Sequence, residues 1–393
     1  MHQSKQAAGL RARESNPLPR LGIIGGGQLA KMTAGAAASF GCEVVVLERT
    51  HDFPAHSVDS HALVGNWDEP AELLKLAALV DVVTLENEFV SPHALRVLEE
   101  RGLKLWPSVR TLSLVQDKLG QKALFAQAGL PVVGFADAPT REAVREFGFP
   151  AVLKSRRNSY DGKGNATVRT PAEVEDGWTT LDGDRNPLYV EALCPFEREL
   201  AIIVTRAPDG RSVEYPVVET VNREHICHLV KVPATVSAAV AADFAALARQ
   251  AVAAVGGVGS FGLEFFLLAD GRILLNEIAP RVHNTGHYTI EACVCSQFEN
   301  HVRAVFGWPL GSAEMVAPAA AMVNLLGFGD GSGVPQGLED ALVVPGARVH
   351  VYGKTRSARG RKMGHVTALA QDVEAAAARA QRAADCIRFG SRT

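Results

Sequence analysis

The sequence has 393 residues, of which 47% are hydrophobic and 21% are charged, and its formal net charge is -3. At roughly 150 residues per domain, this length predicts two or three domains with buried cores. The charge provides no basic field for nucleic acid. Every long apolar run is interrupted by Gly, Pro or a charged residue, so we expect no membrane-spanning segment.

Residues 1–19 are polar and lack the apolar centre of a secretory signal. We interpret them as a disordered tail, with a cleaved organelle-targeting segment as the alternative. The six cysteines are scattered and form no CxxC pair. This usage indicates reduced thiols in a cytoplasmic protein, with neither a zinc site nor a disulfide framework.

The N-terminal region starts as a βαβ unit. Residues 20–24 predict a strand, residues 25–40 a glycine-led helix, and residues 42–47 a strand ending at Glu48. The glycines and Glu48 satisfy the dinucleotide fingerprint, so a NAD-dependent oxidoreductase is one interpretation and a turn that binds nothing is another.

A further buried strand is predicted over residues 80–85. Glu86, Asn87 and Glu88 follow it at the carboxyl edge of the sheet, where open α/β sheets bind ligands. A solvated strand end is the alternative interpretation.

The next region contains two lysines near the ends of predicted elements. Residues 116–129 predict an amphipathic helix with Lys118 near its start, and a strand and a helix are expected to follow over residues 131–150. Residues 151–154 predict a buried strand that ends at Lys154, and a glycine-rich loop over residues 155–165 leads into a second strand. Such a loop can cover phosphates while the lysine supplies charge. A flexible surface hairpin would look the same.

Residues 188–192 and 199–205 predict strands that carry Glu191 and Glu199. A hinge that meets adenine and ribose would have this pattern, and so would an ordinary hairpin with an exposed acid. Strands over residues 213–220 and 225–230 extend the sheet, and an Ala-rich helix over residues 238–256 packs on it.

A hairpin is predicted next, because Asp270-Gly271 separates two apolar runs. With Asp270 and Gly271 as the two turn residues, Leu268 faces Ile273 and Glu264 faces Glu277. Like charges directly opposed across strands are destabilising, so a cation between the two glutamates is expected, and oxygen ligands favour Mg²⁺. The alternative is a longer turn with both glutamates offset on a solvated edge.

Polar and cationic residues follow this hairpin directly, among them Arg281, His283 and Asn284. We expect one helix over residues 289–306, a looser segment over residues 307–340, and a small β region over residues 341–351. Basic residues return at Lys354 and at residues 361–365, and a last Ala-rich helix covers residues 370–387.

From about residue 21 to the last helix, the chain resembles ATP-grasp enzymes, and more narrowly the 5-(carboxyamino)imidazole ribonucleotide synthase family of purine biosynthesis. The motifs that carry the resemblance occur in order: GGGQLA, ENE, DK, SYDGKGN, NEIAPRVHNTGHYTIEACVCSQFENHVRAV, YGK and RKMGH. The resemblance implies an α/β and α+β ATP-grasp fold. It has an N-terminal Rossmann-like domain, a small glycine-rich lid subdomain and a C-terminal mixed α+β domain.

The domain limits expected from this resemblance are a tail over residues 1–19 and a Rossmann-like substrate domain over residues 20–115. They continue with a lid domain over residues 116–197, a metal-binding core over residues 198–320 and a C-terminal region over residues 321–393. The family also implies a homodimer.

The resemblance implies that ATP, bicarbonate and 5-aminoimidazole ribonucleotide react through carboxyphosphate to give the N-carboxy product, ADP and phosphate. Mg²⁺, with Mn²⁺ as an alternative, would be held by Glu264 and Glu277. Nucleotide contacts would come from Lys118, Lys154, Ser159, Tyr160, Asp161, Gly162, Lys163, Gly164, Asn165, Glu191, Ala192, Leu193, Cys194, Glu199, Asn222, Asn276 and Glu277. Asn222 departs from the His or Gln common at its position.

The resemblance also implies the ribonucleotide site, formed by Gln28, Glu86, Tyr160, Arg281, His283, Asn284, Lys354 and Arg361. Arg281 would stabilise charge derived from bicarbonate, and Lys354 is counted with it among the catalytic residues. Asp161 is the candidate for handling the amine proton. His283 competes for that role, because an unperturbed histidine has a pKa near neutrality.

Three other classes remain as alternatives at this point. A formyl- or biotin-directed ATP-grasp relative would share the hairpin and lid but not the PRVHNTGHYT segment. An oxidoreductase would leave the opposed glutamates unexplained. A non-catalytic nucleotide-binding scaffold would have no use for both glutamates and both lysines.

Overall fold

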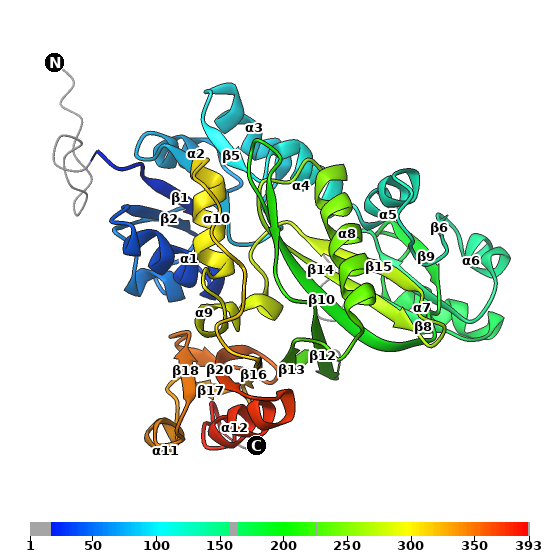
Figure 1. Ribbon diagram of the computed structural model, residues 1–393. Coiled ribbons are helices and arrows are strands. Elements are labelled where there is room, and N and C mark those ends of the chain that lie inside the picture. The colour runs from blue at the N-terminus through cyan, green and yellow to red at the C-terminus, as the bar shows by residue number, and fades with distance from the viewer. Residues whose placement is uncertain (1–16, 158–163, 225, 392–393) are drawn as a thin grey trace.

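The structure, a computed structural model, describes residues 17–157, 164–224 and 226–391. Within these ranges the strands form sheets of five, four and nine strands and one short two-stranded pair. Figure 1 shows the five-stranded sheet (blue) at one end and the four-stranded sheet (green) at the other. The long central strands lie between them, and the C-terminal segment (orange and red) lies below. None of the described helices is long and apolar enough to cross a membrane.

The five-stranded sheet is parallel and doubly wound, in the order β3-β2-β1-β4-β5. Along β2, Val44 and Val46 face α1 and α10, whereas Val45 and Leu47 face α2 and α3. Both faces are therefore buried, as the continuous apolar run predicts. The elements are β1 (Leu21–Ile24), α1 (Gln28–Ser39), β2 (Val44–Glu48), η1 (Pro54–Ser57), β3 (His61–Val64), α2 (Pro70–Ala77), β4 (Val82–Leu85), α3 (Pro92–Glu100), β5 (Lys104–Trp106) and α4 (Val109–Gln116).

The four-stranded sheet is antiparallel, in the order β6-β9-β7-β8. Trp178 and Val144 from its two helices pack on Leu153 and Val190. The elements are β6 (Phe135–Ala138), α6 (Arg141–Phe147), β7 (Ala151–Ser155), β8 (Asn165–Val168), η2 (Pro171–Glu173), α7 (Val174–Thr180) and β9 (Leu188–Ala192).

The nine-stranded sheet runs β15-β14-β10-β12-β13-β16-β20-β18, with β11 on β10. Helix α8 packs on one face of β10 and β14, and Ala292 of α9 packs on the other face of β10. The elements are α5 (Lys118–Gln127), β10 (Phe196–Arg206), β11 (Ser212–Glu214), β12 (Val218–Arg223), β13 (Ile226–Val232), α8 (Ala238–Ala254), β14 (Gly259–Leu268), β15 (Ile273–Ala279), η3 (Asn284–Gly286), α9 (Thr289–Ala292), α10 (Gln297–Phe306), β16 (Ala319–Leu326), α11 (Leu338–Leu342), β18 (Ala347–Val351), β20 (Lys362–Ala370) and α12 (Val373–Ala384). The short pair is β17 (Gly331–Ser332) and β19 (Arg356–Ser357).

Two sequence expectations are wrong in this region. The helix predicted over residues 289–306 is two helices, because Ser296 caps α10 and the preceding residues pair with the backbone of residues 312–314. The segment expected to be looser contains β16, which joins the C-terminal strands to the core sheet through β13. Its three alanines have low strand propensity, so tertiary pairing decides its conformation. The domain limits given above stay predictions.

Candidate active site

Glu264 and Glu277 face each other directly across β14 and β15, as predicted. The predicted turn is nevertheless wrong. The loop has three residues, 269–271, with Gly271 at φ 85°, and Leu267 rather than Leu268 faces Ile273. A bulge at Asn276 then shifts the register back by one residue, so the two glutamates are opposed after all.

The glutamate pair carries excess negative charge. Burial, together with the charges of Glu277 and Glu199, raises the pKa of Glu264 to about 7. The Nζ of Lys118, at the start of α5, contacts Oε1 of Glu277. No group of three or more His, Cys, Asp or Glu side chains that could hold a metal occurs in the described ranges. The pair therefore fits Mg²⁺ only with further oxygens from phosphate or water, which is its usual mode of binding.

The two lysines predicted to bind ATP phosphates meet different carboxylates, because Lys118 contacts Glu277 and Lys154 contacts Glu191. Lys154, at the end of β7, lies 2.7 Å from Glu191, and Lys122, on α5, lies 3.1 Å from the same carboxylate. Burial opposes ionisation of Glu191, but the two ammonium groups hold its pKa below the usual value. The Glu191 side chain is 3% exposed, and its carboxylate lies between the two lysines.

Other predicted nucleotide residues lie along the adjoining strand ends. The backbone of Ala192 and Leu193 bonds to Gly134 and Pro150, and Cys194 follows them. Asn222 donates to the carboxylate of Glu199, so the unusual asparagine binds the acid predicted to meet ribose. Gly164 and Asn165 lie at the start of β8. The predicted contacts of Ser159, Tyr160, Asp161, Gly162 and Lys163 fall outside the described residues.

The glycine loop after β1 packs against the end of β4. A Cβ on Gly27 would lie closer than 3.0 Å to the Glu86 carboxylate, which explains the third glycine of the run. Gln28 begins α1 directly after this loop. The Gly26 N–H donates to Glu48 over 2.8 Å, so the pyrophosphate donor that a dinucleotide would need is already used.

Three segments of the chain converge on Glu86. Burial raises its pKa, and the charges of Arg281 and Lys354 oppose this rise. Glu86 comes from the Rossmann-like sheet, Arg281 follows β15, and Lys354 follows β18. Glu86, Arg281 and Lys354, three of the residues predicted to hold the ribonucleotide, therefore interact at the carboxyl edge of β1 and β4, where the strand order reverses.

Arg281 forms a two-pronged ion pair with Glu88, with Nη2 to Oε1 at 2.9 Å. Burial works against the charge of Arg281, but Glu88 raises its pKa. The guanidinium is thus fixed and charged beside the glutamate pair.

His283 is poorly suited to take the amine proton at neutral pH. Burial, followed by the charges of Arg281, Lys362 and Lys118, lowers its pKa well below the usual value. Its Nδ1 pairs with Thr285 over 2.9 Å, and its Nε2 lies 3.8 Å from Glu264. The pKa of His283 in this environment therefore lies below that of an unperturbed histidine.

Asn284 and Arg361 bond within the protein. The Asn284 amide exchanges two hydrogen bonds with Asn324 on β16, at 2.9 and 2.7 Å. Arg361 is exposed and donates to the Arg356 carbonyl over 2.6 Å. Neither contact tests the predicted ribonucleotide roles.

The loop that carries Lys354 is fastened to the N-terminal domain. Lys31 on α1 donates to the carbonyls of Val351 and Tyr352 at 3.3 and 3.1 Å. Thr355 donates to Asp52, and Lys354 itself donates to the Lys362 carbonyl over 2.7 Å.

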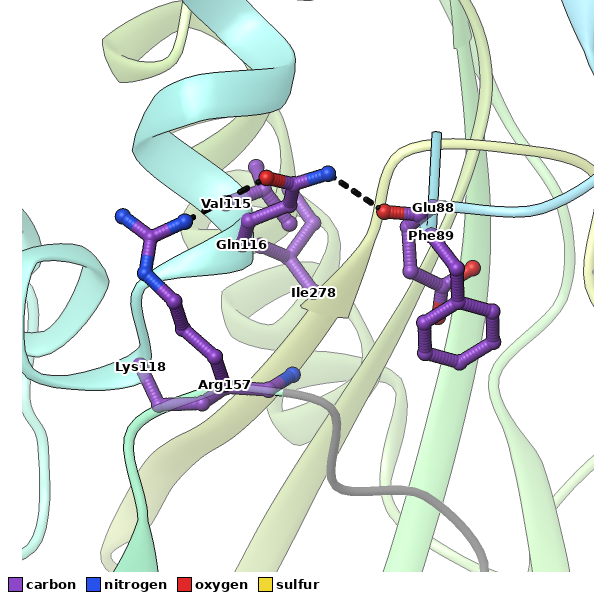
Figure 2. A pocket seen from close by; sticks show the side chains of 7 residues that line it. All are labelled: Glu88, Phe89, Val115, Gln116, Lys118, Arg157 and Ile278. Carbon is purple, nitrogen blue, oxygen red and sulfur yellow. Dashed lines mark hydrogen bonds between the residues drawn. The ribbon is translucent and has the colours of Figure 1, made fainter. Parts of the chain in front are cut away.

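A small cavity of about 40 Å³ lies beside Arg281, between the end of β4 and the start of α5. Figure 2 shows the Gln116 amide bridging its walls, donating to the Glu88 carbonyl (2.7 Å) and accepting from Arg157 (3.4 Å). The lining residues are Glu88, Phe89, Val115, Gln116, Lys118, Arg157 and Ile278.

Three residues that the sequence analysis did not select are Lys31, Lys122 and Asn324, and the pairing of Glu88 with Arg281 was not predicted. Lys122 could have been found, because it lies one helical turn after Lys118. Glu88 belongs to the motif already quoted, but its pairing with Arg281 spans 193 positions.

Family models match nearly all of this architecture. A ribonucleotide synthetase preATP-grasp domain matches residues 18–116, an ATP-grasp domain residues 123–298, and a phosphoribosylaminoimidazole carboxylase C-terminal domain residues 320–379. The fold and site therefore define an ATP-grasp ligase.

More closely, N5-carboxyaminoimidazole ribonucleotide synthase of Synechococcus elongatus is 42% identical over 357 residues, 90% of each chain. The crystal structure of N5-carboxyaminoimidazole ribonucleotide synthetase from Thermotoga maritima superposes with a TM-score of 0.86 at 39% identity, covering 95% of this chain and 100% of that one. The structure of N5-carboxyaminoimidazole synthase from Aspergillus clavatus, solved with ADP and 5-aminoimidazole ribonucleotide, superposes with a TM-score of 0.85 at 35% identity. The match covers 93% of this chain and 98% of that one. The chain belongs to the N5-carboxyaminoimidazole ribonucleotide synthase family, and the oxidoreductase interpretation is wrong.

Proposed function

We propose that this enzyme carboxylates 5-aminoimidazole ribonucleotide with ATP and bicarbonate, giving the N5-carboxy product, ADP and phosphate in purine biosynthesis. The observation that carries the proposal is the convergence of Glu86, Arg281 and Lys354 beside the opposed glutamates. This convergence supports a substrate-binding edge beside a phosphoryl-transfer site, in a chain whose family includes an enzyme solved with ADP and 5-aminoimidazole ribonucleotide.

The reaction is written as two transfers. A bicarbonate oxygen attacks the γ-phosphorus of ATP, ADP leaves, and carboxyphosphate forms. The amine of the ribonucleotide then attacks the carboxyl carbon, phosphate leaves, and the nitrogen loses a proton. Phosphoryl transfer is accelerated mainly by positioning and by charge at the transferred group.

The described residues support these steps in distinct ways. Lys118 and Lys154 supply positive charge for the ATP phosphates from α5 and β7. Arg281, fixed by Glu88, stabilises bicarbonate-derived charge beside the glutamate pair. Lys354, fastened through Lys31, holds the anionic ribonucleotide.

Glu264 and Glu277 would hold Mg²⁺, with Mn²⁺ as an alternative, because an opposed carboxylate pair needs a cation. The ion would neutralise charge on the ATP phosphates when bound. Asp161 remains the proposed group for the amine proton. We also propose that the enzyme acts in the cytoplasm and that it is a homodimer. Sedimentation of the purified chain tests the oligomeric state.

ADP release tests the main proposal. The enzyme is mixed with ATP, Mg²⁺ and bicarbonate, with and without 5-aminoimidazole ribonucleotide. We expect strong stimulation by the ribonucleotide. If a different amine or acid stimulates instead, the family assignment stays and the substrate is overturned.

A further inference from the structure

Lys122 is a buried lysine that the proposed mechanism does not use. Its side chain is 2% exposed, and its Nζ lies 3.1 Å from Oε1 of Glu191. The Nζ also donates to the Leu275 carbonyl over 3.4 Å, one residue before the bulge at Asn276. Lys122 therefore connects the four-stranded sheet, through β9, with β15 of the core sheet.

The surroundings of Lys122 define a charge balance. Glu191 forms ion pairs with Lys122 through one oxygen, at 3.1 Å, and with Lys154 through the other, at 2.7 Å. With all three groups ionised, the net charge is +1; burial lowers the pKa of Lys122, and the charge of Glu191 opposes this shift. Their side-chain exposures are 2% for Lys122, 3% for Glu191 and 17% for Lys154, so this charge reaches the cleft through Lys154.

Burying an ammonium group is costly unless it satisfies a partner. If Glu191 were paired with Lys154 alone, its negative charge would cancel the positive charge of Lys154. Because the buried ammonium group of Lys122 also pairs with Glu191, one positive charge remains. The arrangement thus supplies positive charge at Lys154 from a lysine whose own side chain is only 2% exposed.

We propose that Lys122 is a positioning residue for the nucleotide phosphates: its ammonium group offsets the charge of the Glu191 carboxylate from the buried side, so that the charge of Lys154 remains available to a nucleoside di- or triphosphate. The inference rests on the proposed function only for the identity of this ligand. It predicts a role in phosphate binding, and none in recognising the base or the ribonucleotide.

Isothermal titration of the full-length enzyme with ADP tests this role. Lys122→Met keeps the length of the side chain and lowers the net charge of the group from +1 to 0. We expect ADP affinity to fall on the order of tenfold to a hundredfold, while adenosine, which has no phosphate, binds as to the wild type. The double variant Lys122→Met/Glu191→Gln restores +1 and is expected to recover most of the lost ADP affinity.

A purely structural lysine gives a different pattern. The double variant, which removes two buried partners, would then bind ADP no better than Lys122→Met, and this result overturns the proposal. Unchanged ADP affinity in Lys122→Met overturns it as well. Lys75→Met, at an exposed lysine paired with Glu72, is the matched control and should bind ADP normally. If Lys122→Met does not fold, Lys122→Gln, which keeps an N–H donor, carries the same comparison.

ADP titration is independent of carboxylation. Loss of ribonucleotide-stimulated turnover in the wild type would sink the proposed function. Failed rescue in the double variant would sink only the role of Lys122.

Discussion

His301 on α10 joins the N-terminal sheet to the core and should make the protein sensitive to mild acid. Its ring is buried, with Nδ1 accepting from the Ser260 N–H at 3.0 Å. Its Nε2 lies 2.8 Å from the Thr84 hydroxyl, which donates to the Trp106 carbonyl. Both ring nitrogens are used only if Nε2 carries the proton and the ring is neutral.

The sign and size of the effect follow from the lowered pKa. Burial lowers the pKa of His301 to about 4, whereas an unfolded histidine has a pKa near 6.5. Between pH 6.5 and pH 4 the unfolded chain binds a proton at His301 that the folded chain does not. The contribution of His301 to the free energy of unfolding is therefore complete above about pH 6.5 and decreases as the pH is lowered towards 4. Each pH unit costs about 1.4 kcal/mol, so lowering the pH from 7 to 5 removes about 2 kcal/mol through His301 alone.

Urea unfolding of wild type and His301→Gln at pH 7 and pH 5 measures this contribution. Gln keeps an acceptor for Ser260 and a donor for Thr84 but does not titrate. The wild type should therefore lose about 2 kcal/mol more than the variant between the two pH values. Other buried histidines, such as His287, titrate in both proteins and cancel.

An exposed histidine provides the control. His93→Gln, at the start of α3, should lose as much stability as the wild type. Equal losses in wild type and His301→Gln would refute the reasoning, since they would mean that burial does not keep this ring neutral.

Three further changes test the site. Glu277→Ala should abolish ATP turnover while leaving the circular dichroism spectrum intact, and turnover at the wild-type rate would remove Glu277 from the proposed metal site. Lys354→Ala should raise the KM for the ribonucleotide much more than that for ATP, because the loop lies at the Glu86 edge; an equal rise in both contradicts this. Gly262→Ala places a Cβ closer than 3.0 Å to the His283 ring, so thermal unfolding should show a loss of about 1–3 kcal/mol, and an unchanged melting temperature would show that the ring moves freely.

The sequence predicts local pattern well and long-range partners poorly. The Asp-Gly hairpin pattern predicts the opposed glutamates, and this prediction is correct only because two departures from the assumed register cancel. A three-residue loop shifts the register by one, and the bulge at Asn276 shifts it back. Neither is visible in a run of apolar residues.

Buried charged side chains are the second feature that the sequence pattern does not predict. Lys122 and Lys154 meet at Glu191 only after α5, β7 and β9 have packed together. A lysine in an amphipathic helix is usually solvated, so the pattern alone favours the wrong environment for Lys122. β16 was missed for a similar reason, because its alanines form a strand only through pairing with β13 and β20.

The contacts that hold the Lys354 loop against the N-terminal domain bear on the order in which the site is assembled. Lys31 contacts Val351 and Tyr352 across 320 and 321 positions, and Asp52 contacts Thr355 across 303. Contacts of such separation form late in folding, because the intervening chain must order first. A chain synthesised only as far as residue 330 contains the opposed glutamates together with Lys118 and Lys154, but it lacks Lys354. We therefore expect the site proposed for the ribonucleotide to be completed only after the last segment has been synthesised.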